Sequence, residues 1–286
     1  MERRLRADSH DARKKVQGIS ASFSIILVEY LEQPGRLTAS RRCEAKRLQE
    51  AFGNQSALDI KPHDILSYID ERREEVSDST INKELVLFSA AINEYNKRFG
   101  ASIPNPAARS KLREPQGRSR WITKEEATRL ISLASPHVAD YITIGLYTGM
   151  RRLEMTSLRW SDVDQSRGVM AVRCSKTKRG ETKYRHVPIH GNVNAALENC
   201  KARWPESPLV FDGIQDFKTG FRGACARAGI EQFTPHDMRH TFASWLVMGG
   251  VSLYEVKDLL GHSTIKLTER YAHLAPENLK AAVNRL

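Results

Sequence analysis

Residues 101–120 interrupt the chain with a stretch, ASIPNPAARSKLREPQGRSR, that is rich in proline, serine and arginine and has no hydrophobic periodicity. Such a composition is typical of a linker, because proline and small polar residues favour neither helices nor strands. Only helical spacing precedes this stretch, whereas helical and strand patterns both follow it. A chain of 286 residues is long enough for two domains. The sequence therefore predicts two domains joined by a linker at 106–120.

The region before the linker, residues 20–105, carries helical patterns only. Apolar residues recur at intervals of three or four, and Pro34-Gly35 and Gly100 supply helix stops. Four helices are expected, at 22–31, 38–52, 62–74 and 81–99. The second is strongly basic, and either a solvated helix face or a face on a DNA backbone explains its charges. Residues 1–19 are polar and predict a flexible N-terminus.

The region after the linker, residues 121–274, mixes helices with a β-hairpin. Alternating apolar residues at 169–174 and 183–189 predict two strands joined by a basic turn. Helices are expected at 123–134, 136–149, 151–158, 192–203 and 216–228, followed by three helical pieces between Thr234 and Leu274. The predicted fold class is mainly α: an all-α N-terminal domain plus a mixed α+β domain with a small antiparallel sheet.

Four short motifs of the second domain combine arginine and histidine with one tyrosine. They are Thr148-Gly-Met-Arg151-Arg-Leu-Glu154, His236-Asp-Met-Arg239-His-Thr-Phe-Ala243, Leu260-Gly-His262 and Thr268-Glu-Arg-Tyr271. His236 and Arg239 are three residues apart, so they share one face of a helix. Cations and imidazoles can hold the oxyanion of a phosphate group while a phenol attacks the phosphorus. The motifs therefore predict a site that handles phosphate.

In residue type, order and spacing, these motifs resemble the signature of the tyrosine recombinase (phage integrase) family. The resemblance implies a helical, SAM-like core-binding domain at 20–105, which clamps DNA, and a catalytic domain at 121–274. It implies a site-specific DNA recombinase or integrase that acts in DNA integration, excision or resolution. The implied chemistry is like that of type IB topoisomerases: a 3′-phosphotyrosyl link forms, and a 5′-hydroxyl later reseals the strand. The covalent link keeps the bond energy, so neither a cofactor nor a metal is expected.

The resemblance also gives each site residue a role. Tyr271 is the expected nucleophile. Arg151 and Arg239 are expected on the non-bridging phosphate oxygens, because a guanidinium fork matches paired oxygens. His236 is expected to accept the tyrosine proton or to bond the phosphate, and His262 to bond the phosphate.

A lysine on the β-hairpin is the expected general acid, which protonates the leaving 5′-oxygen. Three lysines lie there, Lys176, Lys178 and Lys183, and Lys176 fits the motif best. The predicted catalytic set is therefore Arg151, Lys176, His236, Arg239, His262 and Tyr271.

Three neighbours of these residues have less specific expectations. Glu154, three residues after Arg151, either orients that arginine or forms an ordinary i,i+3 surface pair. His240 and His273 do not belong to the family's catalytic set, so both are expected to be structural.

The last residues, 275–286, predict a short amphipathic tail helix that begins near Pro276. Its apolar stripe suits packing on its own domain. The resemblance implies the alternative, docking in a neighbouring protomer, which would link the active sites of a homotetramer on DNA. Accessory DNA-bending or directionality proteins stay open as further partners.

Charge and cysteine usage agree with a DNA-acting protein. The formal net charge is +11 and the pI is near 9.6, which favours a polyanionic partner such as double-stranded DNA. The four cysteines form no C-x-x-C pair, so inert thiols in a reducing cytosol are expected. No apolar signal-peptide core follows the basic N-terminus, and no segment is long enough to span a bilayer. A cytoplasmic protein without a membrane partner is therefore expected.

Two other functions are compatible with parts of the sequence. A non-catalytic DNA-binding protein would explain the charge and the helical first domain, but not the complete catalytic set. A zinc hydrolase would use His236 and His240, spaced like the H-E-x-x-H zinc helix, with His262 as a third ligand. Against it, Asp237 stands where that motif has glutamate, and the motif around Arg151 would have no role.

Overall fold

The computed structural model describes residues 22–114, 120–176 and 182–276. The chain separates into two compact units, Met1–Gly117 and Arg118–Leu286, and each is described by itself. The predicted flexible N-terminus (1–19) and all but the start of the predicted tail helix (275–286) lie outside the described residues. No helix that the structure describes combines the length and hydropathy needed to cross a membrane.

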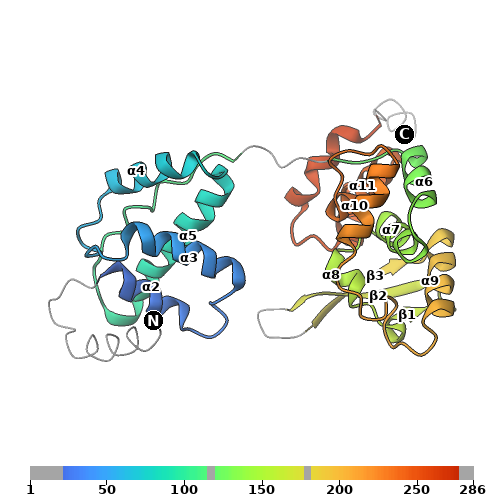
Figure 1. The fold of residues 1–286 in the computed structure, drawn as a ribbon, viewed down its shortest axis with the longest axis horizontal. Helices are drawn as coiled ribbons and strands as arrows, with labels where there is room; N and C mark the ends of the chain where they lie inside the picture. The colour runs from blue at the N-terminus through green and yellow to red at the C-terminus, as the bar shows by residue number, and fades with distance from the viewer. Residues whose placement is uncertain (1–21, 115–119, 177–181, 277–286) are drawn as a thin grey trace, which may run out of the picture. The chain divides into compact units, whose positions relative to one another are not determined.

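Within its described part, the first unit contains the four predicted helices around an aromatic core (Figure 1). They are α2 (Phe23–Leu31), α3 (Ala39–Phe52), α4 (Pro62–Arg73) and α5 (Asp78–Phe99). α5 begins earlier than predicted, because Ser77 takes the extended N-cap conformation. In the core, Phe23 stacks on Phe88 with 4.4 Å between ring centroids, and Phe52 lies edge-on to both. Burial of these large rings stabilises the unit.

Asparagine side chains fasten the segment after α5 to that helix. Asn96 accepts a hydrogen bond from the Ile103 N–H at 3.0 Å and donates to the Ile103 carbonyl at 2.8 Å. Asn82, only 4% exposed, bonds the N–H and carbonyl of Leu112 at 2.8 and 3.0 Å. These amides satisfy backbone groups that have no helix or strand partner. The described part of the predicted linker, 106–114, therefore lies along α5.

The second unit combines helices and strands as the sequence predicts. Its α-helices are α6 (Lys124–Ser132), α7 (Pro136–Thr148), α8 (Arg152–Thr156), α9 (Gly191–Arg203), α10 (Lys218–Arg227), α11 (Pro235–Met248) and α12 (Leu253–Leu260). Its 3-10 helices are η1 (Trp160–Asp162), η2 (Ile265–Leu267) and η3 (Glu269–Leu274). The strands β1 (Val163–Asp164), β2 (Val169–Lys176) and β3 (Thr182–Pro188) form an antiparallel sheet in that order. The predicted mainly α fold class is confirmed.

Two details of the second unit differ from the sequence-based expectation. Strand β1 is not predicted, because two residues are too few to show an alternating pattern. The last helical piece of the chain consists of the 3-10 turns η2 and η3 and is not an α-helix. The β-branched Thr264, Ile265 and Thr268 lower the helix propensity of this segment.

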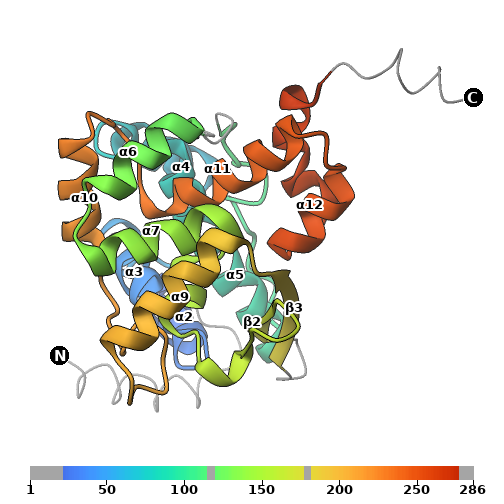
Figure 2. The same cartoon turned by 90° about the vertical axis from the view of Figure 1, so that its right-hand side faces the viewer.

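Helix α7 is the central element of the second unit. Figure 2 shows it between α9 and α11, and it contacts both. Tyr141 and Ile144 of α7 are fully buried in the main core. A smaller core lies beside it, where Phe242 of α11, Leu260 of α12 and Tyr271 of η3 pack together. This smaller core brings the motifs of α11, α12 and η3 into contact.

Candidate active site

Arg239 joins two of the sequence motifs. It lies in the second turn of α11 and is 3% exposed. Its Nη1 donates to the carbonyl of Gly149 at 2.7 Å, and its Nη2 donates to the carbonyl of Leu260 at 2.6 Å. Gly149 lies two residues before Arg151, and Leu260 lies two residues before His262, so one guanidinium holds both motif loops. Both acceptors are neutral, which leaves the positive charge available to an anion.

Glycines direct the backbone of these two loops. Gly149 ends α7 with φ 61°, and Gly261 ends α12 with φ 66°, a left-handed conformation that residues with side chains disfavour. A Cβ atom at Gly149 would lie 2.5 Å from Cδ1 of Phe242 and 2.9 Å from Cδ2 of Leu260. Gly149 is therefore required both for its conformation and for space, and its position delivers the carbonyl to Arg239.

Glu154 connects Arg151 to the β-hairpin. Arg151, the N-cap of α8, donates its backbone N–H and its Nη1 to the Glu154 carboxylate at 2.8 and 2.9 Å. Arg185 of β3 donates Nη1 and Nη2 to the same carboxylate at 3.0 and 2.8 Å, and its Nε to the Leu259 carbonyl at 2.8 Å. Burial raises the pKa of Glu154, but the hydrogen bonds from Arg185 and Arg151 outweigh it and leave the pKa lowered. Glu154 thus orients Arg151 within a network.

The hydroxyl of Tyr271 bonds His240, a residue that the motif spacing leaves as structural. Tyr271 lies in η3 and is 1% exposed. Its Oη is 2.5 Å from Nδ1 of His240, which directly follows Arg239 and is 6% exposed. Burial, helped by His236 and Arg270, lowers the pKa of His240 to about 4. The ring is therefore neutral at pH 7, and Nδ1 can accept the phenol proton.

His236 lies beside His240, and His262 contacts Thr268, the residue that precedes η3. The His236 ring lies edge-on to the His240 ring, with 5.0 Å between centroids. His236 as a whole residue is exposed. Loss of water around the ring and the Arg239 guanidinium lower the pKa of His236. His262 bonds Oγ1 of Thr268 through Nδ1 at 2.8 Å, and burial followed by Arg239 lowers its pKa to about 4. Both rings therefore favour the neutral form at pH 7.

The arginines create a positive potential around the tyrosine. Burial, with Arg151 and Arg185 next in effect, lowers the pKa of Arg239 to about 9, so it stays charged at pH 7. Burial raises the pKa of Tyr271, and Arg270 and Arg239 act against this rise. Guanidinium groups that repel one another in this way favour a bound anion. The tyrosine needs both a proton acceptor and that cationic field to attack at neutral pH.

The structure locates the hairpin lysines only in part. Lys176 ends β2, where it pairs in register with Thr182 after an irregularity that begins at Arg173. Lys178 lies outside the described residues, and Lys183 is exposed on β3. The choice among the three lysines therefore stays a prediction. The other predicted residues are brought together by the loops and helices around Arg239: Arg151, His236, Arg239, His262 and Tyr271.

The motifs missed two residues of the site, Arg185 and His240, but the sequence contains a signal for each. On β3, Arg185 and Val187 are buried and alternate with the exposed Tyr184. A charged residue on the apolar face of a predicted strand indicates a buried ionic partner. His240 lies four residues after His236, which places it on the same helix face as the predicted site.

The described residues offer no alternative metal centre. Among them, no three His, Cys, Asp or Glu side chains gather in a way that suits a metal ion. The three histidines of the zinc alternative, His236, His240 and His262, are therefore not such a group.

In this mainly α chain, the second unit surrounds a buried tyrosine with arginines and histidines, a cationic site of a kind that favours a bound anion. The family model for the phage integrase family matches residues 120–278. The integrase of Salmonella phage P22 is 33% identical over 184 residues, which cover 59% of this chain and 48% of that protein. Tyrosine recombinase XerA of Thermococcus kodakarensis is 31% identical over 240 residues, covering 78% of this chain and 81% of that protein. The chain belongs to the phage integrase family, and it spans about half the length of the P22 relative.

Solved structures share the fold. The Tn1549 transposon integrase in complex with transposon right end DNA matches with a TM-score of 0.77 and 19% sequence identity. The match covers 93% of this chain and 99% of that chain. At this identity the likeness establishes the fold class alone, and the mainly α architecture with a small sheet agrees with it.

Proposed function

We propose that the chain is a site-specific DNA recombinase or integrase that cleaves and rejoins DNA strands through a 3′-phosphotyrosyl intermediate. The observation that carries the proposal is the position of Arg239. Its two carbonyl bonds draw the loops of Arg151 and His262 together, in the same packed region as Tyr271. Membership of the phage integrase family supports this activity, with integration, excision or resolution as its outcomes.

In the proposed reaction, Oη of Tyr271 attacks the phosphorus of a scissile phosphodiester, and the bond from phosphorus to the 5′-oxygen breaks. Arg151 and Arg239 hold the non-bridging oxygens. They stabilise the pentacoordinate transition state more than the substrate, because negative charge builds up there. Attack by a new 5′-hydroxyl on the phosphotyrosyl link reverses these steps and joins the strand, with no net change in the number of phosphodiester bonds.

Proton transfer is assigned to the remaining residues. The leaving 5′-oxygen takes a proton from a hairpin lysine, for which we propose Lys176, with Lys178 and Lys183 as alternatives. His236 and His262 bond the phosphate oxygens. Their lowered pKa values keep these rings largely neutral at pH 7, so they act as hydrogen-bond partners and the arginines supply the charge.

His240 holds the nucleophile and accepts its proton in this proposal. The 2.5 Å contact from Nδ1 to the phenol oxygen supports that role, which the resemblance gave to His236 as one of two alternatives. Tyr271 is 1% exposed, so a phosphodiester reaches its oxygen only after the segment Glu269–Leu274 shifts. This segment is a 3-10 turn, whose hydrogen bonds have poorer geometry than those of an α-helix.

Double-stranded DNA is the proposed partner. The helical unit (20–105) would act as a clamp, with 106–120 as the connection to the catalytic domain (121–274). The tail (275–286) would link protomers into a homotetramer on DNA, with accessory DNA-bending or directionality proteins as further partners. Because the substrate is DNA, the cytoplasm is the proposed site of action.

Capture of covalent protein–DNA adducts from expressing cells, followed by sequencing of the attached strand, tests this function and identifies the target site. Nicked substrates built from that site should give an SDS-resistant adduct with the wild type. Tyr271→Phe should bind the same DNA and give none, because only the attacking oxygen is lost. An adduct with Tyr271→Phe would refute the nucleophile. Binding without any adduct from the wild type would favour the non-catalytic alternative, and loss of activity in EDTA would favour the metal alternative.

The same assay separates the two histidines. His240→Ala should lower the rate of adduct formation by about 100- to 10,000-fold, the usual contribution of a positioned proton acceptor. His240→Asn, which retains a polar atom near the position of Nδ1, should recover part of this loss. A wild-type rate in His240→Ala, together with a large loss in His236→Ala, would return the role to His236.

A further inference from the structure

Two arginines of the first unit share one tyrosine hydroxyl. Nη1 of Arg36 and Nη1 of Arg41 each lie 2.9 Å from Oη of Tyr30. Their guanidinium carbons also lie near the ring, 4.8 and 5.5 Å from its centroid. Tyr30 belongs to α2 and is 2% exposed, so its ring is fixed by the core. The buried tyrosine thereby holds two cationic groups side by side.

The hydrogen-bond count around Tyr30 leaves one donor without a partner in the described part of the chain. A phenol oxygen can accept two hydrogen bonds and donate one. Arg36 and Arg41 take both acceptor positions. The phenol proton therefore has no acceptor among the residues that the structure describes.

The charges around Arg36 and Arg41 also indicate a ligand that accepts hydrogen bonds, and specifically an anion. Several arginines of this unit are paired with carboxylates, among them Arg47 with Glu50, Arg73 with Asp78 and Arg98 with Glu29. By contrast, no carboxylate among the residues that the structure describes forms an ion pair with Arg36 or Arg41. Two neighbouring guanidinium groups without a counter-charge repel each other, and an anion between them removes that repulsion.

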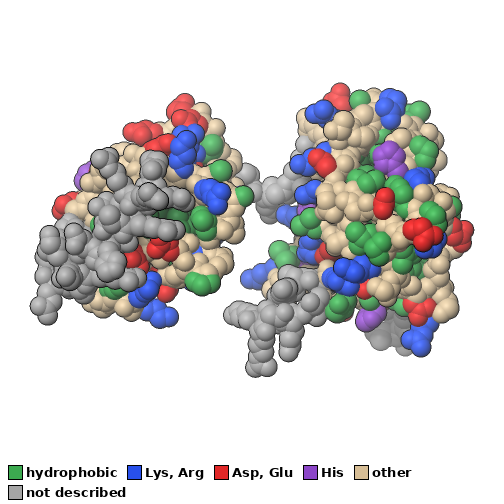
Figure 3. Space-filling model, turned by 60° about the horizontal axis from the view of Figure 1, so that its bottom comes forward, with side chains coloured by type: hydrophobic (Ala, Val, Ile, Leu, Met, Phe, Trp, Pro, Cys, Tyr) green, Lys and Arg blue, Asp and Glu red, His purple; other side chains and the backbone are tan. Residues whose placement is uncertain are grey.

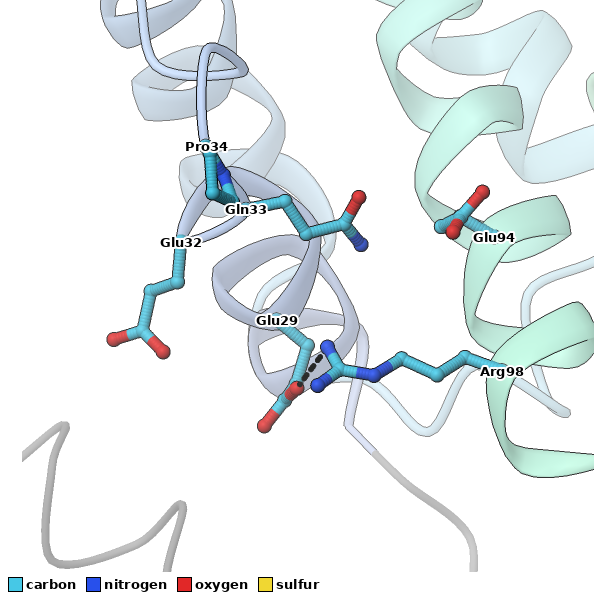
Figure 4. Close-up of a pocket in the computed structure, with 6 residues that line it drawn as sticks. All are labelled: Glu29, Glu32, Gln33, Pro34, Glu94 and Arg98. Atoms are coloured by element: carbon cyan, nitrogen blue, oxygen red, sulfur yellow. Dashed lines mark hydrogen bonds and ion pairs between the residues drawn. The ribbon is translucent and has the colours of Figure 1, made fainter.

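The surroundings show on which side of α2 an anion would bind. The α2 residue Glu29 and the α5 residue Glu94 line a pocket together with Glu32, and Glu29 pairs there with Arg98 (Figure 4). Those carboxylates would repel an anion. Elsewhere on the surface, lysine and arginine side chains are mixed with carboxylates, as Figure 3 shows for one face. Arg36 and Arg41 lie instead at the connection from α2 to α3 and in the first turn of α3.

We propose that Tyr30, Arg36 and Arg41 form a preorganised binding site for one backbone phosphate of duplex DNA. The site rests on the proposed function, since it names a contact of the DNA clamp. Thr38, between the two arginines, caps α3, and the first N–H groups of that 14-residue helix also favour an anion. Because Tyr30 already holds both guanidinium groups, little side-chain freedom is lost when the phosphate binds.

Equilibrium binding of the full chain to a random-sequence duplex over a salt series tests the site, because phosphate contacts do not depend on base sequence. The double variant Arg36→Gln/Arg41→Gln should bind about tenfold more weakly and lower the slope of log K against log salt by about 0.9, the value for one phosphate. Tyr30→Phe keeps the ring and should lose about threefold, because it leaves the guanidinium groups unanchored.

Arg47→Gln is the matched control. It removes one charge from the same helix at a position already paired with Glu50, so its affinity should change by less than about twofold. A double variant that binds like Arg47→Gln would overturn the site. So would a loss of binding to phosphatidylglycerol vesicles with unchanged duplex binding.

The adduct assay distinguishes this failure from failure of the proposed function. Adduct formation by the wild type, with unchanged duplex binding by the double variant, rejects only the phosphate site. Absence of an adduct from the wild type on its captured target rejects the recombinase itself. Thermal unfolding of each variant confirms that a loss of binding does not come from unfolding.

Discussion

The two arginines expected on the phosphate are held by regions of opposite character. Around Arg239, which is 3% exposed, the partners are two neutral carbonyls. Around Arg151, whose side chain is 45% exposed, the partner is the Glu154 carboxylate, which Arg185 shares. Burying a charge without a counter-charge is costly, whereas an exposed ion pair is nearly neutral in stability.

This difference in surroundings suits the two arginines to different roles. Arg239 is fixed and keeps its full charge, so a phosphate meets a prepared positive group. Arg151 is partly neutralised and open to solvent, so it can change partners when an anion enters. Arg239 also holds two motif loops, and its loss affects geometry as well as charge. We therefore expect loss of Arg239 to reduce both stability and strand cleavage more than loss of Arg151 does.

Arg239→Lys tests the upper end of this ranking. Lysine keeps the charge but cannot donate to both carbonyls in the planar geometry of a guanidinium. Strand cleavage should fall by about 100- to 1,000-fold, as for loss of one preorganised transition-state donor. Arg151→Lys is the matched variant and should lose less in the same adduct assay. A larger loss in Arg151→Lys than in Arg239→Lys would reverse the comparison.

Gly149→Ala tests the loop that carries one carbonyl to Arg239. The new Cβ would meet Phe242 at 2.5 Å, in a backbone conformation with φ 61°. We expect a loss of about 2–4 kcal/mol in the free energy of unfolding, from strain and overpacking together. Gly168→Ala is the control, because φ is 64° there and no atom lies within 4 Å of its Cβ position. Its loss should be about 1 kcal/mol, measured by urea denaturation. Equal losses at the two glycines would exclude packing as the cause.

The sequence predicted the architecture well where local patterns decide it. The helix stop predicted at Gly100 is the αL C-cap of α5, and the two predicted strands of the hairpin are β2 and β3. Contacts between segments far apart in the sequence could not be predicted in this way. The bonds from Arg239 to Gly149 and Leu260 connect residues 90 and 21 positions apart, which no local pattern encodes.

The position of the nucleophile illustrates the same limit. The family resemblance offered His236 as a possible acceptor of the Tyr271 proton and left His240 as structural, whereas the ring that meets Tyr271 is that of His240. That choice depends on how η3 packs against α11, and the small core of Phe242, Leu260 and Tyr271 determines it. Tertiary packing therefore supplied the information that the motif lacked.

Glu154→Gln tests the ion-pair network around Arg151, the more exposed of the two arginines. The substitution keeps the shape but removes the charge that Arg185, with its side chain 6% exposed, requires. We expect a loss of about 1–3 kcal/mol at pH 7, because the carboxylate that accepts two hydrogen bonds from this buried guanidinium loses its charge. Glu50→Gln is the control, since Glu50 is an exposed partner of Arg47, and it should change stability by less than about 0.5 kcal/mol.

The pH dependence of this stability loss identifies its cause. The pKa of Glu154 is lowered in the folded chain, so the unfolded state binds its proton first as the pH falls. The stabilisation from Glu154 is therefore fully present above the ordinary carboxyl pKa of about 4.3, and it is lost as the pH falls through the lowered folded value. Urea denaturation should show a constant gap between wild type and Glu154→Gln from neutral pH to about pH 5, and a smaller gap below about pH 4. A gap that persists unchanged in acid would mean that the shape of the side chain stabilises the site and its charge does not.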